Sequence, residues 1–487
     1  MELEKFLKYL EEIERINYLI TTLKWEMDTV APEKSLDYLI NTSTFLEMKS
    51  FKLMTNKKYI ELIENLINSN EYKKLSEEEK IYINDIKENY YKFKKVPKKF
   101  YQEFCTLKKN SLNAWIKAKE KNDYELFKPY LKKIIDYTKK YYRYMYDNPT
   151  NLYDCMLNDY EKNINSEFID KLFSNLKKEL IPIIKEIKIE DKSKINIHLE
   201  DSKFISFAKL LLDYIGFDNS RGSLGIYTHG YTTKLNNNDI RITFSNRDNP
   251  IDSISTIIHE GGHGIFDQNI GSNLSKYGIY EVNKYALHES QSRFYENMLG
   301  RRKSFYEPIY DEIKKYLNID MPIDEFVSYF NLVRPSLVRT EADELTYPMH
   351  IIIRYEIERD IFNDNLDLDN LKEIWNKKYQ EYLGVSSIDD KNGIIQDMHW
   401  SDGSFGYFPS YLLESIFDGM LLELMNEEVG NIDQLLKNGK IKEITNYLNK
   451  NIHKYGGSYN INEVANRLFG KDLDITPLIN YYKSKYK

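Results

Sequence analysis

Two histidines one helical turn apart carry the clearest chemical signal in this chain. Residues 256–266 read Thr-Ile-Ile-His-Glu-Gly-Gly-His-Gly-Ile-Phe, so His259 and His263 would project from the same face of a helix. Two imidazoles at this spacing can bind one Zn²⁺, and Glu260 between them can take a proton from an attacking water. Because the flanking residues are apolar, we expect the helix to be buried, where unpartnered imidazoles would be costly. The pattern predicts a metal site that activates water, not a chance pair of surface histidines.

The same segment contains Gly261, Gly262 and Gly264. Each glycine costs about 1 kcal/mol relative to alanine in the interior of a helix. A helix tolerates this cost where something must approach its backbone closely. A peptide substrate is one candidate for that approach.

A catalytic zinc needs a third protein ligand and an open position. Candidates lie in the segment 285–295, which has a helical pattern and contains both His288 and Glu289. These two side chains point about 100° apart on a helix, so spacing alone does not choose between them. Asp267, one turn beyond His263, is either a carboxylate that orients an imidazole or a solvated side chain without a role.

A second cluster, residues 334–344, places two arginines and three acids among apolar residues. A guanidinium held by carboxylates, such as that of Arg339, is prepared to grip another carboxylate with two hydrogen bonds. A structural ion-pair network fits the same composition equally well.

Two further stretches have the composition of active-site loops. Residues 393–400 contain Gln396, Asp397, His399 and a tryptophan, and residues 401–411 are rich in glycine and aromatic residues. A tyrosine or histidine in such a loop could donate a hydrogen bond to an oxyanion. An ordinary surface loop with packed aromatic residues would look the same.

Most of the chain shows apolar residues at helical spacing, for example at 3–20 and 173–187. One stretch departs from this pattern, because 225–233 is β-branched and aromatic, 236–238 is a run of asparagines, and 239–244 alternates polar and apolar residues. We therefore expect a mainly helical protein with a small antiparallel hairpin just before the metal motif. The segment 190–202 is charged and less periodic, and is the best candidate for an internal seam.

Composition excludes several classes of protein. The 487 residues are 41% hydrophobic with 12 prolines and 20 glycines, which suits a large core and not a disordered chain. The net charge of −7 lacks the broad basic character of a nucleic-acid binder. A mean hydropathy of −0.60 and the lack of a run of 18 apolar residues argue against a membrane protein. Cys105 and Cys155 are too few for a disulfide framework, and no export signal is seen at the start, so we expect a cytoplasmic protein.

Five motifs, in order, resemble those of the carboxypeptidase Taq family of zinc metallocarboxypeptidases. They occupy residues 239–243, 259–263, 288–291, 338–343 and 393–400. A weaker family pattern is kept at 25–29 and Pro32. The resemblance runs from one end of the chain to the other.

This resemblance implies a set of roles. His259, His263 and Glu289 would bind one Zn²⁺ per subunit, with Co²⁺ as a possible substitute, and Glu260 would be the general base. Arg339 would bind the terminal carboxylate of the substrate. The motifs at 239–243 and 393–400 would close the far end of the groove, so that only a chain terminus fits. The side chains expected to contact substrate, including those of the aromatic loop, are Arg339, His229, Asp239, Arg241, Gln396, Asp397, His399, Tyr407 and Tyr411.

The resemblance also implies a single helical domain over residues 1–487, with a deep groove, a small sheet beside the metal helix, metal and substrate motifs within 225–411, and a homodimeric assembly. The implied activity removes single residues from the C-terminal end of peptides with a free carboxylate, with broad specificity. The chain departs from the family where His229 is followed by Gly230 and Tyr231 in place of Pro-Phe, which frees the local backbone. Two alternatives share the metal motif: a helical endopeptidase, and a peptide-binding protein that has lost catalysis.

Overall fold

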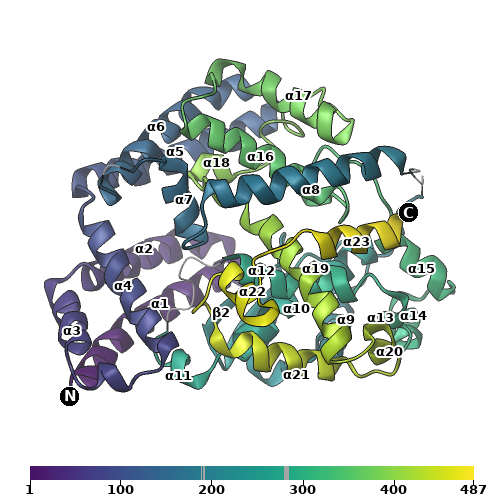
Figure 1. Ribbon diagram of the computed structural model, residues 1–487, viewed down its shortest axis with the longest axis horizontal. Coiled ribbons are helices and arrows are strands. Elements are labelled where there is room, and N and C mark those ends of the chain that lie inside the picture. The colour runs from purple at the N-terminus through teal and green to yellow at the C-terminus, as the bar shows by residue number, and fades with distance from the viewer. Residues whose placement is uncertain (148, 188, 190–191, 279–284) are drawn as a thin grey trace.

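The computed structural model describes residues 1–487 except 148, 188, 190–191 and 279–284, and it is dominated by helices (Figure 1). The helices of the N-terminal half are α1 (Glu2–Thr29), α2 (Leu36–Met54), α3 (Lys57–Ile67), α4 (Glu77–Lys94), α5 (Lys98–Lys121), α6 (Lys128–Met145), α7 (Leu152–Tyr160), α8 (Ser166–Glu186) and α9 (Asp201–Ile215). Those around the metal motif are α10 (Pro250–Gln268), α11 (Ser272–Ser275), α12 (Tyr285–Arg293), the π-helical turn η5 (Phe294–Leu299), α13 (Lys303–Tyr306), α14 (Tyr310–Leu317) and α15 (Ile323–Phe330).

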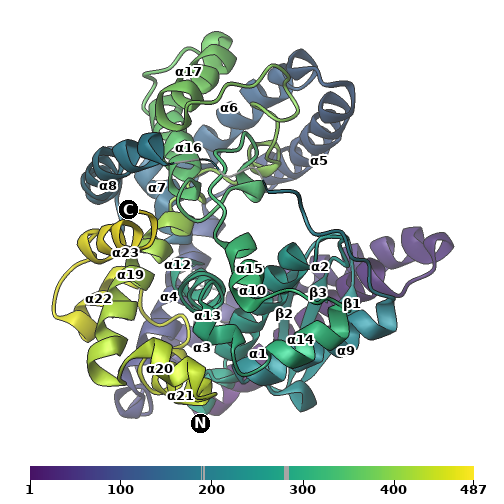
Figure 2. The same ribbon diagram turned by 90° about the vertical axis from the view of Figure 1, so that its right-hand side faces the viewer.

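The C-terminal part contains α16 (Tyr347–Phe362), α17 (Leu371–Leu383), α18 (His399–Asp402), α19 (Ser410–Glu428), α20 (Ile432–Lys437), α21 (Ile441–Asn451), α22 (Ile461–Phe469) and α23 (Thr476–Tyr486). Seen from the side, α5, α6, α16 and α17 form one part of the molecule, and α9, α10 and the strands form another (Figure 2). Within the described residues, no helix is long and apolar enough to cross a membrane.

The small sheet has three strands in the order β1-β3-β2: β1 (Gly222–Ile226), β2 (Tyr231–Asn236) and β3 (Asp239–Phe244). The predicted hairpin is confirmed, because β2 pairs antiparallel to β3. The sequence pattern did not separate β1, which pairs parallel to β3 and makes the sheet mixed. The chain leaves the sheet between β1 and β2 at Gly230, where a Cβ atom would lie 2.4 Å from Cγ2 of Thr256 on α10.

Among the described residues, most buried apolar side chains belong to one of two clusters. The main core contains residues from α5 through α23, and a smaller core contains residues of α1, α3 and α4 together with Tyr277. Of the predicted seam at 190–202, residues 190–191 lie outside the described residues, and the remainder is irregular up to the start of α9. Leu180 before the seam and Phe204 after it pack into the same main core.

The three glycines of the metal motif let α10 lie close to its neighbours. A Cβ at Gly261 would lie 2.5 Å from Cδ1 of Ile215 on α9, and one at Gly262 would lie 2.6 Å from the carbonyl oxygen of Gln291 on α12. The close approach inferred from the sequence is therefore made by protein elements at these two positions, and not by a substrate. It holds α12 against the metal-motif face of α10.

Candidate metal centre and substrate groove

Side chains from α10 and α12 bring three potential metal ligands together. Nε2 of His259 lies 3.8 Å from Oε1 of Glu289, and Nε2 of His263 lies 3.4 Å from Oε2 of the same carboxylate. The ligand atoms of the three residues all lie within 4.8 Å of one another. His288, the alternative that spacing left open, instead stacks its ring on His263 at 4.3 Å.

A second layer of side chains orients these groups. Nδ1 of His259 lies 2.9 Å from Oε2 of Glu296, which turns Nε2 toward Glu289. Nε of Arg293 donates to Oε1 of Glu289 at 3.3 Å. Sequence reasoning missed Glu296 and Arg293, although positions 289, 293 and 296 have the i, i+4, i+7 spacing of one helix face. A carboxylate that fixes an imidazole in this way is typical of metal-binding histidines.

Asp267 is buried and contacts an imidazole, which is one of the two interpretations that the sequence left open. Its Oδ1 lies 3.4 Å from Nε2 of His288, so it orients His288 and not one of the two motif histidines.

The charges of the site reflect its burial. Burial alone would lower the pKa of His259, but the carboxylates of Glu289 and Glu296 raise it to about 9. Burial lowers the pKa of His263 to about 4. Burial opposes ionisation of Glu289, yet His259 and His263 hold its pKa well below the usual range. A fixed carboxylate facing two imidazole nitrogens thus attracts positive charge, and this donor set is one that Zn²⁺ prefers.

Glu260 lies beside this group and is 6% exposed. Its Oε2 accepts a hydrogen bond from the hydroxyl of Thr232 on β2 at 2.8 Å. Burial raises the pKa of Glu260, as is common for a general base that must take up a proton near neutral pH. Gly230 borders the same carboxylate, because a Cβ there would lie 3.3 Å from Oε1 of Glu260. Thr232 of β2 therefore binds Glu260, and Gly230 just before β2 packs against its carboxylate.

Arg339 lies in a buried network of charges. Its Nη2 lies 3.0 Å from Oδ1 of Asp397, and Arg354 binds the other oxygen of Asp397 at 2.6 Å. Gln396 accepts from the backbone N–H of Arg339 at 2.8 Å and from Nη2 of Arg354 at 2.7 Å. Gln396 and Asp397 thus contact the two arginines directly. Because two guanidiniums share one carboxylate, this network keeps one surplus positive charge.

Aromatic side chains connect the arginine network with the metal ligands. Nη1 of Arg339 donates to the hydroxyl of Tyr347 at 3.2 Å, and Cζ of Arg293 lies 4.4 Å from the centre of the Tyr347 ring. Cζ of Arg339 also lies 5.3 Å from the Tyr411 ring, and the Tyr411 hydroxyl donates to that of Tyr407 at 3.1 Å.

His399 stacks against Tyr407 with ring centres 5.5 Å apart. Burial lowers the pKa of His399 to about 4, so its ring is neutral at neutral pH. A neutral imidazole can donate or accept a hydrogen bond without adding charge to this region.

The three predicted residues of the sheet region lie elsewhere. Asp239 and Arg241 form an ion pair at 3.1 Å, and Cζ of Arg241 lies 5.1 Å from the ring of Trp25 on α1. His229 is exposed in the turn between β1 and β2, where its carbonyl oxygen accepts from the Thr243 hydroxyl at 3.0 Å. Asp239 and Arg241 therefore attach the sheet to α1.

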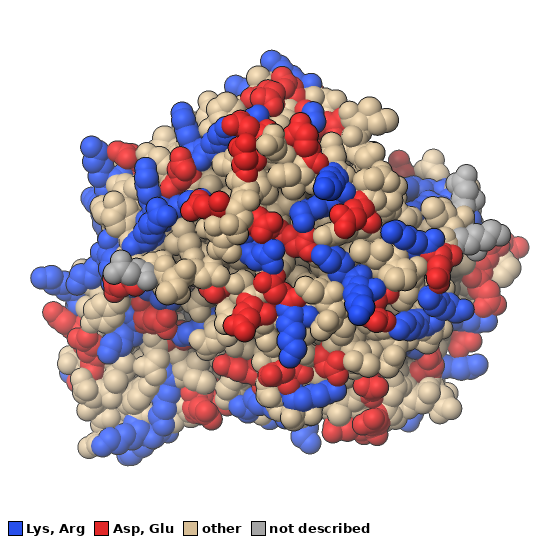
Figure 3. All heavy atoms as spheres, turned by 45° about the horizontal axis from the view of Figure 1, so that its top comes forward, with Lys and Arg blue, Asp and Glu red and all other residues tan. Residues whose placement is uncertain are grey.

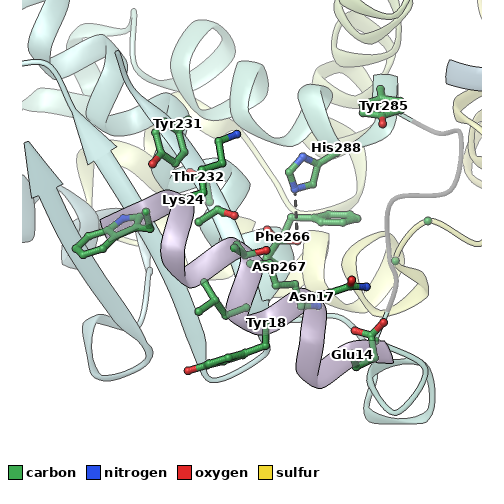
Figure 4. A pocket seen from close by; sticks show the side chains of 18 of the residues that line it. Glu14, Asn17, Tyr18, Lys24, Tyr231, Thr232, Phe266, Asp267, Tyr285 and His288 are labelled. Carbon is green, nitrogen blue, oxygen red and sulfur yellow. Dashed lines mark ion pairs between the residues drawn. The ribbon is translucent and has the colours of Figure 1, made fainter. Parts of the chain in front are cut away.

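A pocket of about 520 Å³ reaches His288, whose ring stacks on His263 (Figure 4). It lies between α1 and β2, and its inner end is formed by Phe266, Asp267 and His288. Figure 4 shows Glu14 and Asn17 of α1 at its other side. Glu260 does not line the pocket itself, but Thr232, its hydrogen-bond partner, does.

Comparisons with known proteins agree with this geometry. Residues 5–486 match the sequence profile of the carboxypeptidase Taq (M32) metallopeptidases. The chain is 34% identical to carboxypeptidase 1 of Bacillus subtilis over 99% of this chain and 97% of that protein. It is 29% identical to thermostable carboxypeptidase 1 of Pyrococcus furiosus, over 97% of this chain and 95% of that protein. The solved structure of Pyrococcus furiosus carboxypeptidase superposes with a TM-score of 0.93, covering 100% of this chain and 99% of that one at 27% identity.

The fold and the His-His-Glu group define a metallopeptidase of the mainly helical type. The chain belongs to the carboxypeptidase Taq (M32) family. It is a metallocarboxypeptidase, which releases amino acids from the C-terminal end of peptides.

Proposed function

We propose that His259, His263 and Glu289 hold one Zn²⁺ for this reaction. The proposal is supported by the convergence of two imidazole nitrogens and one carboxylate within 4.8 Å. When bound, the metal polarises the scissile carbonyl and makes a water molecule more acidic. Glu296 and Arg293 keep the ligands oriented before substrate arrives, which lowers the cost of organising the site.

Glu260 acts as the general base. Its carboxylate takes the proton of the attacking water and later delivers it to the nitrogen of the leaving amino acid. The hydroxyl of Thr232 holds Glu260 through one oxygen, which leaves the other for the water. Tyr407, Tyr411 and His399 are the candidates to donate a hydrogen bond to the developing oxyanion.

Arg339 binds the terminal carboxylate of the peptide. The observation that carries this assignment is the surplus positive charge of the Arg339–Asp397–Arg354 network. Aromatic side chains connect this network with the metal ligands. Gln396 and Asp397 position the guanidinium. The terminal carboxylate thereby fixes which peptide bond lies at the metal, and this makes the enzyme an exopeptidase.

On the opposite side, His229 is exposed and can contact substrate beside Gly230. Asp239 and Arg241 serve the groove by holding α1 against the sheet.

We further propose a cytoplasmic homodimer with one metal per subunit. The free thiols of Cys105 and Cys155 agree with a reducing compartment. Light scattering and metal content per chain measure the assembly and the metal stoichiometry. A monomeric mass or a sub-stoichiometric metal content after reconstitution would contradict this part of the proposal.

The decisive experiment compares an unblocked peptide with its C-terminally amidated twin by timed mass spectrometry. We expect a ladder of single losses from the free carboxyl end, absent with a chelator and slow on the amide. Arg339→Met should abolish the preference for the unblocked peptide. Arg334→Met, which changes the other arginine of the cluster at 334–344, should retain it. Equal cleavage of both peptides by the wild-type enzyme would remove Arg339 from its proposed role.

A further inference from the structure

The net charge of the whole chain conceals a strongly basic region. Residues 92–145 contain sixteen lysines and arginines but only five aspartates and glutamates, a net charge of +11 in a chain whose total is −7. This region consists of the end of α4 together with α5 and α6, which pack against each other. In Figure 3, Lys and Arg side chains project along the upper left of the molecule, the side on which Figure 1 places these helices.

Part of this charge is neutralised by ion pairs. Lys128 and Lys132 pair with Asp369, and Lys139 pairs with Asp364. The exposed lysines of α5 differ, because among the described residues no carboxylate lies within 4 Å of them. They are Lys98, Lys99, Lys109, Lys117 and Lys121. The positive surface of α5 is therefore largely uncompensated.

Helix α5 contacts the backbone of the segment that carries Gln396 and Asp397. Nε1 of Trp115 donates to the carbonyl oxygen of Ile395 at 3.0 Å, and Nζ of Lys119 donates to that of Gln396 at 2.9 Å. At the other end of α5, the ring of Tyr101 stacks on Phe51 of α2 at 5.9 Å. Tyr101, Trp115 and Lys119 share one face of the helix, so this face runs from α2 to the Gln396 backbone. Lys98 and Lys109 flank this face, whereas Lys99, Lys117 and Lys121 lie on the opposite side of the helix. The uncompensated charge therefore lies on the outer surface of the helix whose inner face contacts the Gln396 backbone. At low ionic strength, electrostatic attraction reaches farther than the width of a helix, so this charge can act on a substrate that approaches the Arg339 side.

We propose that the α5 surface attracts acidic peptides and makes them preferred substrates. This inference rests on the proposed function, since it needs the terminal carboxylate to enter on the Arg339 side. A charged surface beside a groove raises the local concentration of oppositely charged substrates and their association rates, by roughly 10- to 1,000-fold in strong cases. The attraction acts over about 30 Å at 0.01 M ionic strength and over about 3 Å at 1 M, so it disappears at high salt.

Two peptides separate this effect from binding of the carboxylate itself. Both are N-acetylated with a free C-terminus and identical last two residues, and their upstream residues are four glutamates in one and four glutamines in the other. At low ionic strength we expect kcat/KM to be about tenfold higher for the glutamate peptide, because its KM is lower. At 1 M salt we expect the two peptides to have nearly equal kcat/KM values. Equal values at low salt would overturn the proposal.

Charge reversal assigns the effect to α5. In Lys109→Glu/Lys117→Glu, the glutamate preference should vanish while cleavage of the glutamine peptide stays at the wild-type rate. The matched control is Lys442→Glu/Lys450→Glu, which reverses two exposed lysines on α21 and should keep the preference. Loss of preference in both variants alike would show a general charge effect and overturn the role of α5.

The glutamine peptide also separates this proposal from the underlying activity. If the enzyme cleaves neither peptide with metal present, the proposed function fails; if it cleaves both equally, only the inference about α5 fails. A labelled single-stranded oligonucleotide tests the other polyanion by fluorescence anisotropy. Tight binding that is lost on α5 charge reversal, without any peptide preference, would assign the surface to nucleic acid instead.

Discussion

At the scale of single residues, Glu260 combines burial with one hydrogen-bond donor, Thr232. Glu260→Gln preserves the shape of the side chain and removes its ability to accept a proton. We expect turnover to fall by roughly 10²- to 10⁴-fold, the usual contribution of a general base, with metal content unchanged. Steady-state kinetics on a free-carboxylate peptide and elemental analysis measure the two quantities. Near-normal turnover would exclude Glu260 as the base.

Glu296 contacts no substrate in our proposal and acts only through His259. Glu296→Gln keeps the volume but weakens the contact with Nδ1 of His259. We expect the metal affinity to fall by roughly 10- to 100-fold, as is typical when an outer carboxylate is lost. Competition with a chromogenic chelator measures the affinity directly. The control is Asp252→Asn, which removes a carboxylate from the first turn of α10. An unchanged affinity would contradict the orienting role.

At the scale of elements, the contact of α10 with α12 decides where Glu289 lies. Gly262→Ala places a methyl group 2.6 Å from the carbonyl oxygen of Gln291, so α12 must move. Overpacking of this kind costs about 1 to 3 kcal/mol, and the shift should also weaken metal binding. Thermal unfolding and chelator competition measure both effects, with Ser255→Ala on the half-buried side of α10 as the control. A variant with wild-type stability and affinity would argue against this contact as the element that positions Glu289.

Helix α16 is joined to α7 and α18 through the buried carboxyl of Glu358. This group accepts hydrogen bonds from Tyr153, Trp400 and the backbone of Gly406, and burial raises its pKa to about 7. Because the pKa is raised in the folded state, the neutral carboxyl of Glu358 contributes its full stabilisation of the fold below about pH 4.5. This stabilisation is lost as the pH rises through 7. By linkage the loss is on the order of 3 kcal/mol. Unfolding free energies at pH 5 and 8 should therefore differ more in the wild-type protein than in Glu358→Gln; equal differences would refute the assignment.

At the scale of the whole molecule, the two cores predict two levels of stability. Among the described residues, the smaller core of α1, α3, α4 and Tyr277 has 13 buried apolar residues, far fewer than the main core that surrounds α10, α16 and α19. Regions with fewer buried contacts open at lower free energy. Hydrogen exchange followed by mass spectrometry should show faster exchange in α3 than in α10 or α19. Uniform protection across these helices would indicate one cooperative unit instead.

Much of the site was predictable from local pattern. The i, i+4 spacing of His259 and His263 fixes a shared helix face because helix geometry is local, and the alternation at 239–244 predicted the hairpin. The parallel pairing of β1 with β3 was not predictable, because the whole of β2 lies between them in the chain and the path from β1 into β2 depends on Gly230 packing against α10. Glu296 was not predicted, because its helical spacing from Glu289 does not say that this face meets His259.

The sequence by itself determined the metal motif, the helical class of the fold and, through its motifs, the resemblance to a family. Spacing left His288 and Glu289 open and the resemblance implied Glu289; physically, the choice depends on how α12 rotates against α10, which turns the Glu289 carboxylate toward both histidines. Tertiary structure decided that Arg339 shares Asp397 with Arg354, a residue outside every motif. Such choices involve charges and glycine contacts between segments distant in the chain, and their energies exist only once those segments are packed together.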